Sequence, residues 1–167
     1  QVGNAHKGQM VSKTRVWGRE AHSSRPDDGV NAVEIAAELI GVLGKLRNYV
    51  RDEGVQDSAF SPPYTSFNIG PISGGSAFNI IPNQCEFDWE FRFIPGDNPD
   101  AILAQYNTYI EDVINPRLQG DQRSLGHIAA PEGGAGGRRR NSGACSCRAE
   151  RHNSARVWYR SRAFSVY

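Results

Sequence analysis

The chain has 167 residues, a formal net charge of +1 at pH 7 and three cysteines. This near-neutral charge gives no general reason to expect a nucleic acid or an anionic membrane as partner, and three cysteines are too few for a disulfide framework. The low number of cysteines makes the reducing cytoplasm the expected compartment. No apolar run approaches the length of a membrane span.

The charge and the hydrophobic pattern change together near residue 119. Residues 1–119 hold 10 basic and 15 acidic residues, a net charge of −5, whereas residues 120–167 hold 9 arginines and 3 acidic residues, a net charge of +6. The second part has no sustained hydrophobic period. We therefore predict a folded domain at 1–119 and a disordered, Arg- and Gly-rich tail at 120–167. Because the sequence begins with Gln1, we also expect that it starts inside a larger protein.

The first half of the domain has three predicted elements. An imperfect alternation of polar and apolar residues predicts a strand at 11–17. Apolar residues then recur at three- and four-residue steps over 31–52, which predicts an amphipathic helix, and Gly54 is expected to end it as a C′ glycine. A proline-containing loop leads to a second strand at 64–72.

The clearest strand pattern lies at 85–93, where every odd position is apolar and every even position is charged. Asn98 and Pro99 then begin a second helix, which is expected to run up to Pro116. This order predicts an α+β fold of the ferredoxin-like, split βαβ type, an antiparallel sheet with two helices on one face. Its fourth strand should follow Leu118, but no strand pattern is found there, so that strand is doubtful.

The main candidate for chemistry is His22, in the segment GREAHSSRPDDGVNA between the first strand and the long helix. Taken alone, such a histidine more often has a structural role. A nucleophile at Ser23 or Ser24 is disfavoured, because neighbours in sequence rarely face each other as nucleophile and base.

The tail offers weaker patterns. Cys145 and Cys147 lack the second pair of a zinc ribbon. The glycines at 133–137 follow no strand and open no helix, as a phosphate-binding loop would. The arginines at 138–140 would bind nucleic acid only non-specifically. We therefore predict no specific nucleic-acid partner and no membrane partner.

Three segments together resemble a known family. In chain order they are AHSSRPDDGVNA, PPYTSFNIGPISGGSAFNIIPNQCEF and WEFRFIPGDNP. They are similar to the two-zinc amidohydrolases and exopeptidases that include acetylornithine deacetylase and succinyl-diaminopimelate desuccinylase, with acetylornithine deacetylase most alike. In that family a ferredoxin-like domain, which serves as lid and dimer interface, is inserted into a catalytic domain. The resemblance covers about residues 6–118 and implies that these form the inserted domain.

The resemblance also implies roles for three residues. His22 would reach across a homodimer to the active site of the partner and stabilise the oxyanion that forms when a metal-bound hydroxide attacks the amide of an N-acyl amino acid. Asn79 and Arg92 would hold the α-carboxylate of that substrate. Two structural interpretations stay open: Arg92 could belong to a solvated cross-strand charge ladder with Glu86, Asp88 and Glu90, and Asn79 could cap a turn.

The chain departs from the family where the metal ligands should be. None of the ligand motifs that precede the inserted domain in the family is present, and His127 and His152 match no ligand motif. We therefore expect no metal site and no cofactor in this chain, although two zinc ions are implied for the parent enzyme. The chain is predicted to be an inactive fragment of an acetylornithine-deacetylase-like metallohydrolase.

One hypothesis accounts for the tail. Residues 158–165 can be encoded by bases that, read one nucleotide later, give Gly-Thr-Glu-Ala-Gly-Leu-Phe-Gln, which resembles a segment of the family's catalytic domain. A frameshift near residue 119 would explain this, and sequencing the gene tests it. The alternative function is a non-catalytic α+β interaction module whose Arg-rich tail binds polyanions weakly.

Overall fold

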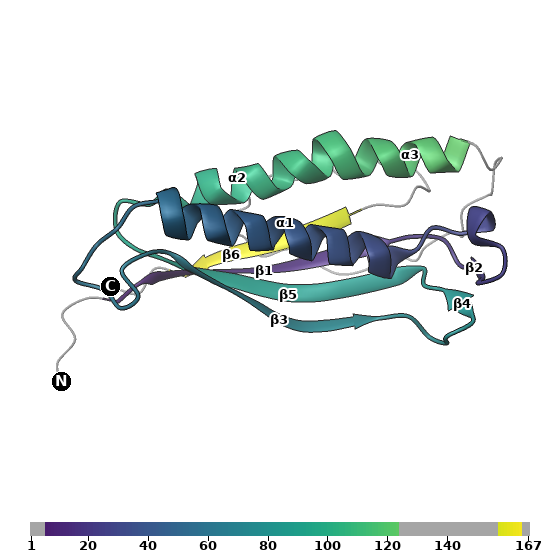
Figure 1. Ribbon diagram of the computed structural model, residues 1–167, viewed down its shortest axis with the longest axis horizontal. Helices are drawn as coiled ribbons and strands as arrows, with labels where there is room; N and C mark the ends of the chain where they lie inside the picture. The colour runs from purple at the N-terminus through teal and green to yellow at the C-terminus, as the bar shows by residue number, and fades with distance from the viewer. Residues whose placement is uncertain (1–5, 124–156, 165–167) are drawn as a thin grey trace, which may run out of the picture.

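The computed structural model describes residues 6–123 and 157–164. The main sheet has four antiparallel strands in the order β3-β5-β1-β6, and the helices lie on one of its faces (Figure 1). The strands are β1 (Gly8–Trp17), β3 (Ser66–Gly74), β5 (Gln84–Phe93) and β6 (Val157–Phe164), and β2 (Ala21–His22) pairs separately with β4 (Ile80–Ile81). This strand order confirms the predicted ferredoxin-like α+β fold.

The helical layer consists of α1 and of a second, composite helix. The elements are a 3-10 turn η1 (Pro26–Asp28), α1 (Ala32–Glu53), α2 (Pro99–Tyr109), the π-helical η2 (Ile110–Ile114) and α3 (Asn115–Arg123). Asn31 caps α1, because its side-chain oxygen accepts hydrogen bonds from the backbone N–H groups of Val33 and Glu34. Asn98 caps α2 in the same way.

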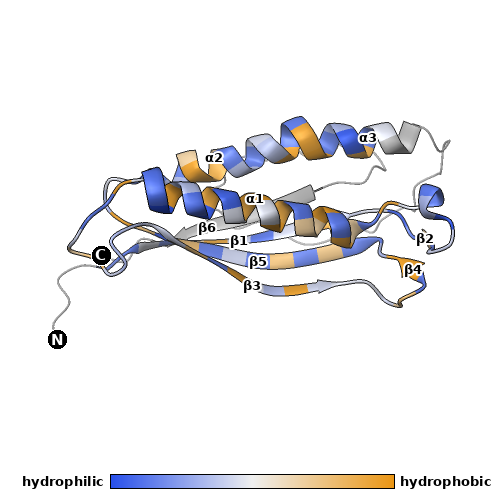
Figure 2. Cartoon of the chain, viewed as in Figure 1, coloured by the Kyte–Doolittle hydropathy of each residue, from blue (hydrophilic) through white to orange (hydrophobic). Residues whose placement is uncertain are grey.

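The core lies between the sheet and the helices, as the patterns predict. In β5, Cys85, Phe87, Trp89 and Phe91 are buried on the helical side, and the charged residues between them lie on the opposite face. Apolar residues of α1 such as Leu39 meet this surface, and Figure 2 shows the resulting alternation of polar and apolar positions along α1 and β5. The period-two and helical patterns therefore identify the buried faces correctly.

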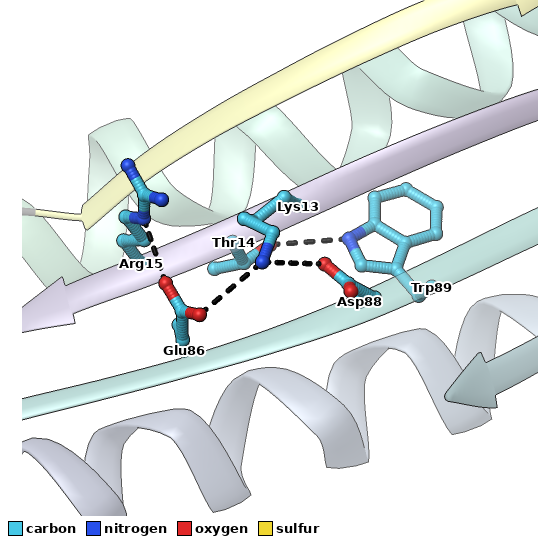
Figure 3. Close-up of polar contacts among 6 residues, drawn as sticks. All are labelled: Lys13, Thr14, Arg15, Glu86, Asp88 and Trp89. Atoms are coloured by element: carbon cyan, nitrogen blue, oxygen red, sulfur yellow. Dashed lines mark hydrogen bonds and ion pairs between the residues drawn. The ribbon is translucent and has the colours of Figure 1, made fainter. Parts of the chain in front are cut away.

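In β1 the buried face contains two hydroxyl groups, Ser12 and Thr14, between Met10 and Val16. Thr14 is fully buried; its Oγ1 accepts a hydrogen bond from Trp89 Nε1 at 3.1 Å, drawn in Figure 3, and is 3.1 Å from the Tyr106 hydroxyl. Burial raises the pKa of Tyr106 well above its ordinary value, so its hydroxyl stays protonated. These polar residues in the core explain why the alternation of β1 is imperfect.

We expect Thr14→Val to lower the free energy of unfolding by about 1–3 kcal/mol, because it leaves the buried Trp89 N–H without its acceptor. Urea unfolding followed by tryptophan fluorescence measures this. Thr14→Ser keeps the oxygen and should cost less. Equal losses for the two variants would show that the hydrogen bond contributes nothing.

Gly54 ends α1 as predicted, but its backbone is extended (φ −81°, ψ −176°). A glycine fits there because an added Cβ would lie 2.2 Å from the Val50 carbonyl oxygen. The second helix does not end near Pro116 but continues to Arg123. Proline cannot donate to the carbonyl four residues back, and the wider π-helical turn, in which Asn115 N–H donates to Ile110 O, precedes it.

The fourth strand lies in the predicted tail. β6 pairs with β1 from Gln9 opposite Phe164 to Val16 opposite Val157. The expectation of a tail without regular structure is therefore wrong at 157–164, and α3 also crosses the predicted boundary at 119/120. Pairing with β6 covers an edge of β1 that would otherwise expose unpaired N–H and C=O groups. The remaining tail patterns (Cys145, Cys147, His127, His152 and residues 133–140) lie outside the described residues.

Candidate functional site

His22 and Asn79 lie at the same end of the molecule. His22 pairs with Ile80 in the ribbon formed by β2 and β4, and the N–H of Ser23 donates to the carbonyl oxygen of Asn79 at 2.9 Å. Figure 1 shows this ribbon at the end of the sheet where β1 finishes. Both side chains are exposed. The structure thus brings together two of the three predicted site residues, although 57 positions separate them in the sequence.

The loop that carries His22 is fixed at its base and at its tip. At the base, Arg19 and Val30 exchange two backbone hydrogen bonds of 2.9 Å each. At the tip, the N–H of Arg25 donates to the carbonyl oxygen of His22 at 2.9 Å, which closes a turn immediately before Pro26. The His22 backbone is therefore held by its own turn and by the ribbon.

Among the described residues, the imidazole of His22 has two hydrogen-bond contacts, both to Nδ1. Ser24 Oγ lies 2.8 Å from Nδ1, and the backbone N–H of Ser24 donates to the same atom at 3.2 Å. Neither contact involves Nε2. The ring is thus oriented by Ser24 while remaining at the surface.

Arg92 lies at the other end of the sheet. It follows Gln84, the first residue of β5, by eight positions, which at about 3.3 Å per residue is about 26 Å. Its guanidinium is 3.4 Å from Glu90 Oε2, and its side chain is half exposed. Within one copy of the chain, the structure therefore does not bring Arg92 together with His22 and Asn79.

The sheet face opposite the helices carries a charge ladder between β1 and β5. Lys13 Nζ lies 3.2 Å from carboxylate oxygens of both Glu86 and Asp88, and Arg15 Nε lies 2.8 Å from Glu86 (Figure 3). Hydrogen bonds from Arg15 and Lys13 hold the pKa of Glu86 below its ordinary value. These opposite charges pair across the two strands. This face therefore carries a solvated charge ladder, which is the structural interpretation of Arg92 given above.

A cleft of about 540 Å³ opens beside the His22 loop, between η1, the first turns of α1, and α3. Its lining includes Ser23, Asn31 and the ion pair of Glu38 with Arg117, whose closest N–O distance is 2.6 Å. Glu38 also accepts a hydrogen bond from the Tyr109 hydroxyl at 2.9 Å. Sequence reasoning missed this cluster, because no local pattern links residues that lie 71 and 79 positions apart.

The pairing of Glu38 should make stability depend on pH. The hydrogen bond from Arg117, and then that from Tyr109, lowers the pKa of Glu38 below 4.5, its ordinary value. A lowered carboxyl pKa stabilises the fold above that ordinary value, and this stabilisation is lost as the pH falls through the lowered pKa. Glu38→Gln should therefore cost about 0.5–1 kcal/mol at neutral pH, with the difference from the wild type shrinking as the pH falls below 4.5.

Urea unfolding at a series of pH values measures this dependence. Glu111→Gln, at an exposed position of η2, is the control and should change stability by less than about 0.5 kcal/mol at any of them. A loss for Glu38→Gln that stays constant into the acidic range would contradict the assignment.

The part of the chain that the structure describes contains no group of three or more His, Cys, Asp or Glu side chains that could hold a metal ion. Within the same ranges, no helix has the length and hydrophobicity needed to cross a bilayer. The described residues thus present exposed polar groups at both ends of the sheet, without a metal centre of their own.

The topology defines a ferredoxin-like domain. Its candidate site residues lie at the surface, with His22 and Asn79 at one end of the sheet and Arg92 at the other. The chain belongs to the peptidase dimerisation domain family, whose profile matches residues 4–117. It is 36% identical over 110 residues to an acetylornithine deacetylase of Myxococcus xanthus, covering 66% of this chain and 29% of that protein. It is 40% identical over 124 residues to an acetylornithine deacetylase of Buchnera aphidicola subsp. Acyrthosiphon pisum (strain Tuc7), covering 74% and 30%.

A solved structure, aminopeptidase PepT from Bacillus cereus, shares the fold with a TM-score of 0.52 at 16% identity. The alignment covers 96% of this chain and 31% of the aminopeptidase. The chain spans about 30% of the length of the curated relatives that it matches. The family and the fold are thus shown, and the predicted membership is confirmed.

Proposed function

We propose that this chain is the dimerisation domain of an amidohydrolase of the acetylornithine deacetylase type, which hydrolyses the amide of an N-acyl amino acid. The observation that carries the proposal is the placement of His22 in β2 and of Asn79 directly before β4, at one end of the sheet. The names of the two curated relatives support the substrate class.

The geometry favours a site shared between two subunits. β1 begins at Gly8, and its ten residues extend for about 33 Å before the chain reaches the loop of His22. A catalytic domain that joins the chain ahead of Gly8 would therefore lie at the end of Arg92, far from His22. In a homodimer, each active site would take Arg92 from one subunit and His22 and Asn79 from its partner.

Each group has a defined chemical task in this arrangement. A ring N–H of His22 would donate to the oxygen on which negative charge develops during attack on the amide. The Arg92 guanidinium offers two parallel N–H groups to a carboxylate, and the Asn79 amide adds a further donor. Arg92 would exchange its contact with Glu90 for the α-carboxylate of the substrate.

The described residues do not fit the two zinc ions that the resemblance implies, because they contain no suitable cluster of ligands. In a parent enzyme, those ions would be bound by another part of the protein. We therefore expect the purified 167-residue chain, supplied with zinc, not to hydrolyse N-acetylornithine. Turnover by this chain alone would contradict the proposal.

A domain exchange tests the function directly. Residues 4–117 replace the matched segment in the Myxococcus xanthus acetylornithine deacetylase, and hydrolysis of N-acetylornithine is measured with light scattering as the check for dimers. We expect an active dimer. A folded, dimeric and zinc-loaded chimaera without activity would overturn the proposal, and the parent enzyme is the control.

The alternative, an interaction module with a polyanion-binding tail, makes a different prediction for the full chain. It would be a monomer that binds RNA at low salt and releases it as the salt concentration rises. Our proposal instead expects a dimer that is indifferent to RNA. Sedimentation and a salt-dependent binding assay separate the two.

A further inference from the structure

The unusual feature at the tip is that two donors converge on one nitrogen of His22. The backbone N–H of Ser24 donates to Nδ1 at 3.2 Å, and Ser24 Oγ lies 2.8 Å from the same atom. A backbone N–H can only donate, so the Nδ1 that receives it must carry a lone pair and no proton. The Ser24 hydroxyl, facing the same lone pair, must then donate as well.

This arrangement determines which nitrogen carries the proton. In a neutral imidazole one ring nitrogen is protonated and the other is not, and a hydrogen bond at one nitrogen sets the state of the other. We propose that Ser24 is a positioning residue that holds His22 in the tautomer with its proton on Nε2. The Nε2–H is then the donor that the exposed ring offers to a ligand.

Backbone hydrogen bonds hold Ser24 against the His22 ring. The hydrogen bond from Arg25 N–H to the carbonyl oxygen of His22 closes the turn that brings Ser24 back over the ring, and Pro26 follows at once with a fixed φ. On the other side, Ser23 N–H is bound to the Asn79 carbonyl. The contact between Ser24 and the His22 ring is therefore maintained although both side chains are exposed.

The chemical use of this tautomer rests on the proposed function, in which His22 stabilises an oxyanion. An oxyanion needs an N–H donor that is in place before charge develops, and a neutral ring with its proton on the outer nitrogen supplies one. A nucleophilic Ser24 would lack the third member of a triad, because no acid among the described residues contacts the His22 ring.

The tautomer can be measured on the full 167-residue chain without any activity. Histidine is labelled with nitrogen-15, and long-range proton–nitrogen NMR spectra are recorded at a pH at which the ring is neutral, with His22→Gln used for assignment. We expect Nδ1 of His22 to show the shift of an unprotonated nitrogen and Nε2 that of a protonated one, with less tautomer averaging than exposed His6.

Two serines provide the matched comparison. Ser24→Ala removes the hydroxyl but keeps the backbone N–H on Nδ1, so it should move the His22 Nδ1 signal only part of the way toward the averaged position of His6. Ser24→Thr keeps the hydroxyl and Ser23→Ala alters none of the ring contacts, so both should leave the signal unchanged. A protonated Nδ1 in the wild type, an unmoved signal in Ser24→Ala, or an equal movement in Ser23→Ala overturns the proposal.

The outcome is separable from that of the proposed function. If the domain-exchange enzyme is inactive while the His22 signature is present, the function fails and the positioning by Ser24 stands. If that enzyme is active but the His22 signature is missing, the positioning by Ser24 fails and the proposed function stands. The core tryptophan signals of each variant confirm that the fold is intact.

Discussion

Replacing Phe91 by alanine is expected to lower the free energy of unfolding by about 3–5 kcal/mol. Phe91 is fully buried in β5, and its ring lies 5.1 Å from that of Phe67 and 6.1 Å from that of Trp89, measured between centroids. Removing it opens a cavity between the sheet and the helices that neighbouring rings cannot fill. Because small domains are stable by only about 5–15 kcal/mol, much of the population would unfold.

The control is a second phenylalanine in an opposite environment. Phe78, in the turn before β4, is 100% exposed, so Phe78→Ala removes the same atoms without a cavity and should change stability by less than about 0.5 kcal/mol. Urea unfolding monitored by circular dichroism compares both variants with the wild type. Similar losses at the two positions would mean that the core does not lie where the burial pattern places it.

The parts of the fold that the sequence predicts are those whose signal is local. The alternation in β5 and the three- and four-residue spacing in α1 each identify a buried face from a single stretch of chain. β1 is harder, because buried Thr14 has its hydrogen-bond partners in β5 and α2, which only the folded chain brings together. β6 has no local signal, since its place is set by the free edge of β1.

For the candidate site, too, the sequence predicts some features and only the structure shows the others. A resemblance in three motifs names His22, Asn79 and Arg92, but it gives no arrangement in space. Two-residue strands such as β2 and β4 are too short to show a period, so the pairing of His22 with Ile80, which brings Asn79 close to His22, is visible only in the structure. The separation of Arg92 follows from the direction of β5, which runs away from the ribbon toward the start of β1.

In the domain-exchange enzyme, His22→Ala is expected to lower kcat for N-acetylornithine by about 10²–10³-fold, the usual cost of removing one donor to an oxyanion. KM should change little, because the contact strengthens only as charge develops. Steady-state kinetics with the dimeric variant measure both constants. A variant that keeps its kcat but loses substrate affinity would place His22 in ground-state binding instead.

Mixing two inactive variants then tests whether the two ends of the sheet serve different sites. In a dimer of one His22→Ala subunit with one Arg92→Ala subunit, one active site would receive intact Arg92 from its own subunit and intact His22 from the partner. After random reassociation of equal amounts, about a quarter of the wild-type activity should return, since half of the dimers are mixed and each has one intact site.

The matched control pairs His22→Ala with Asn79→Ala. His22 lies in β2 and Asn79 directly precedes β4 at the same end of the sheet, so one subunit would deliver both residues to a given site. Every site in a mixed dimer would therefore lack one of them. No activity should return in that mixture. Equal recovery in both mixtures, or recovery in neither, would be incompatible with a site assembled from opposite ends of two domains, because the distance between Arg92 and the ribbon is what makes the two mixtures differ.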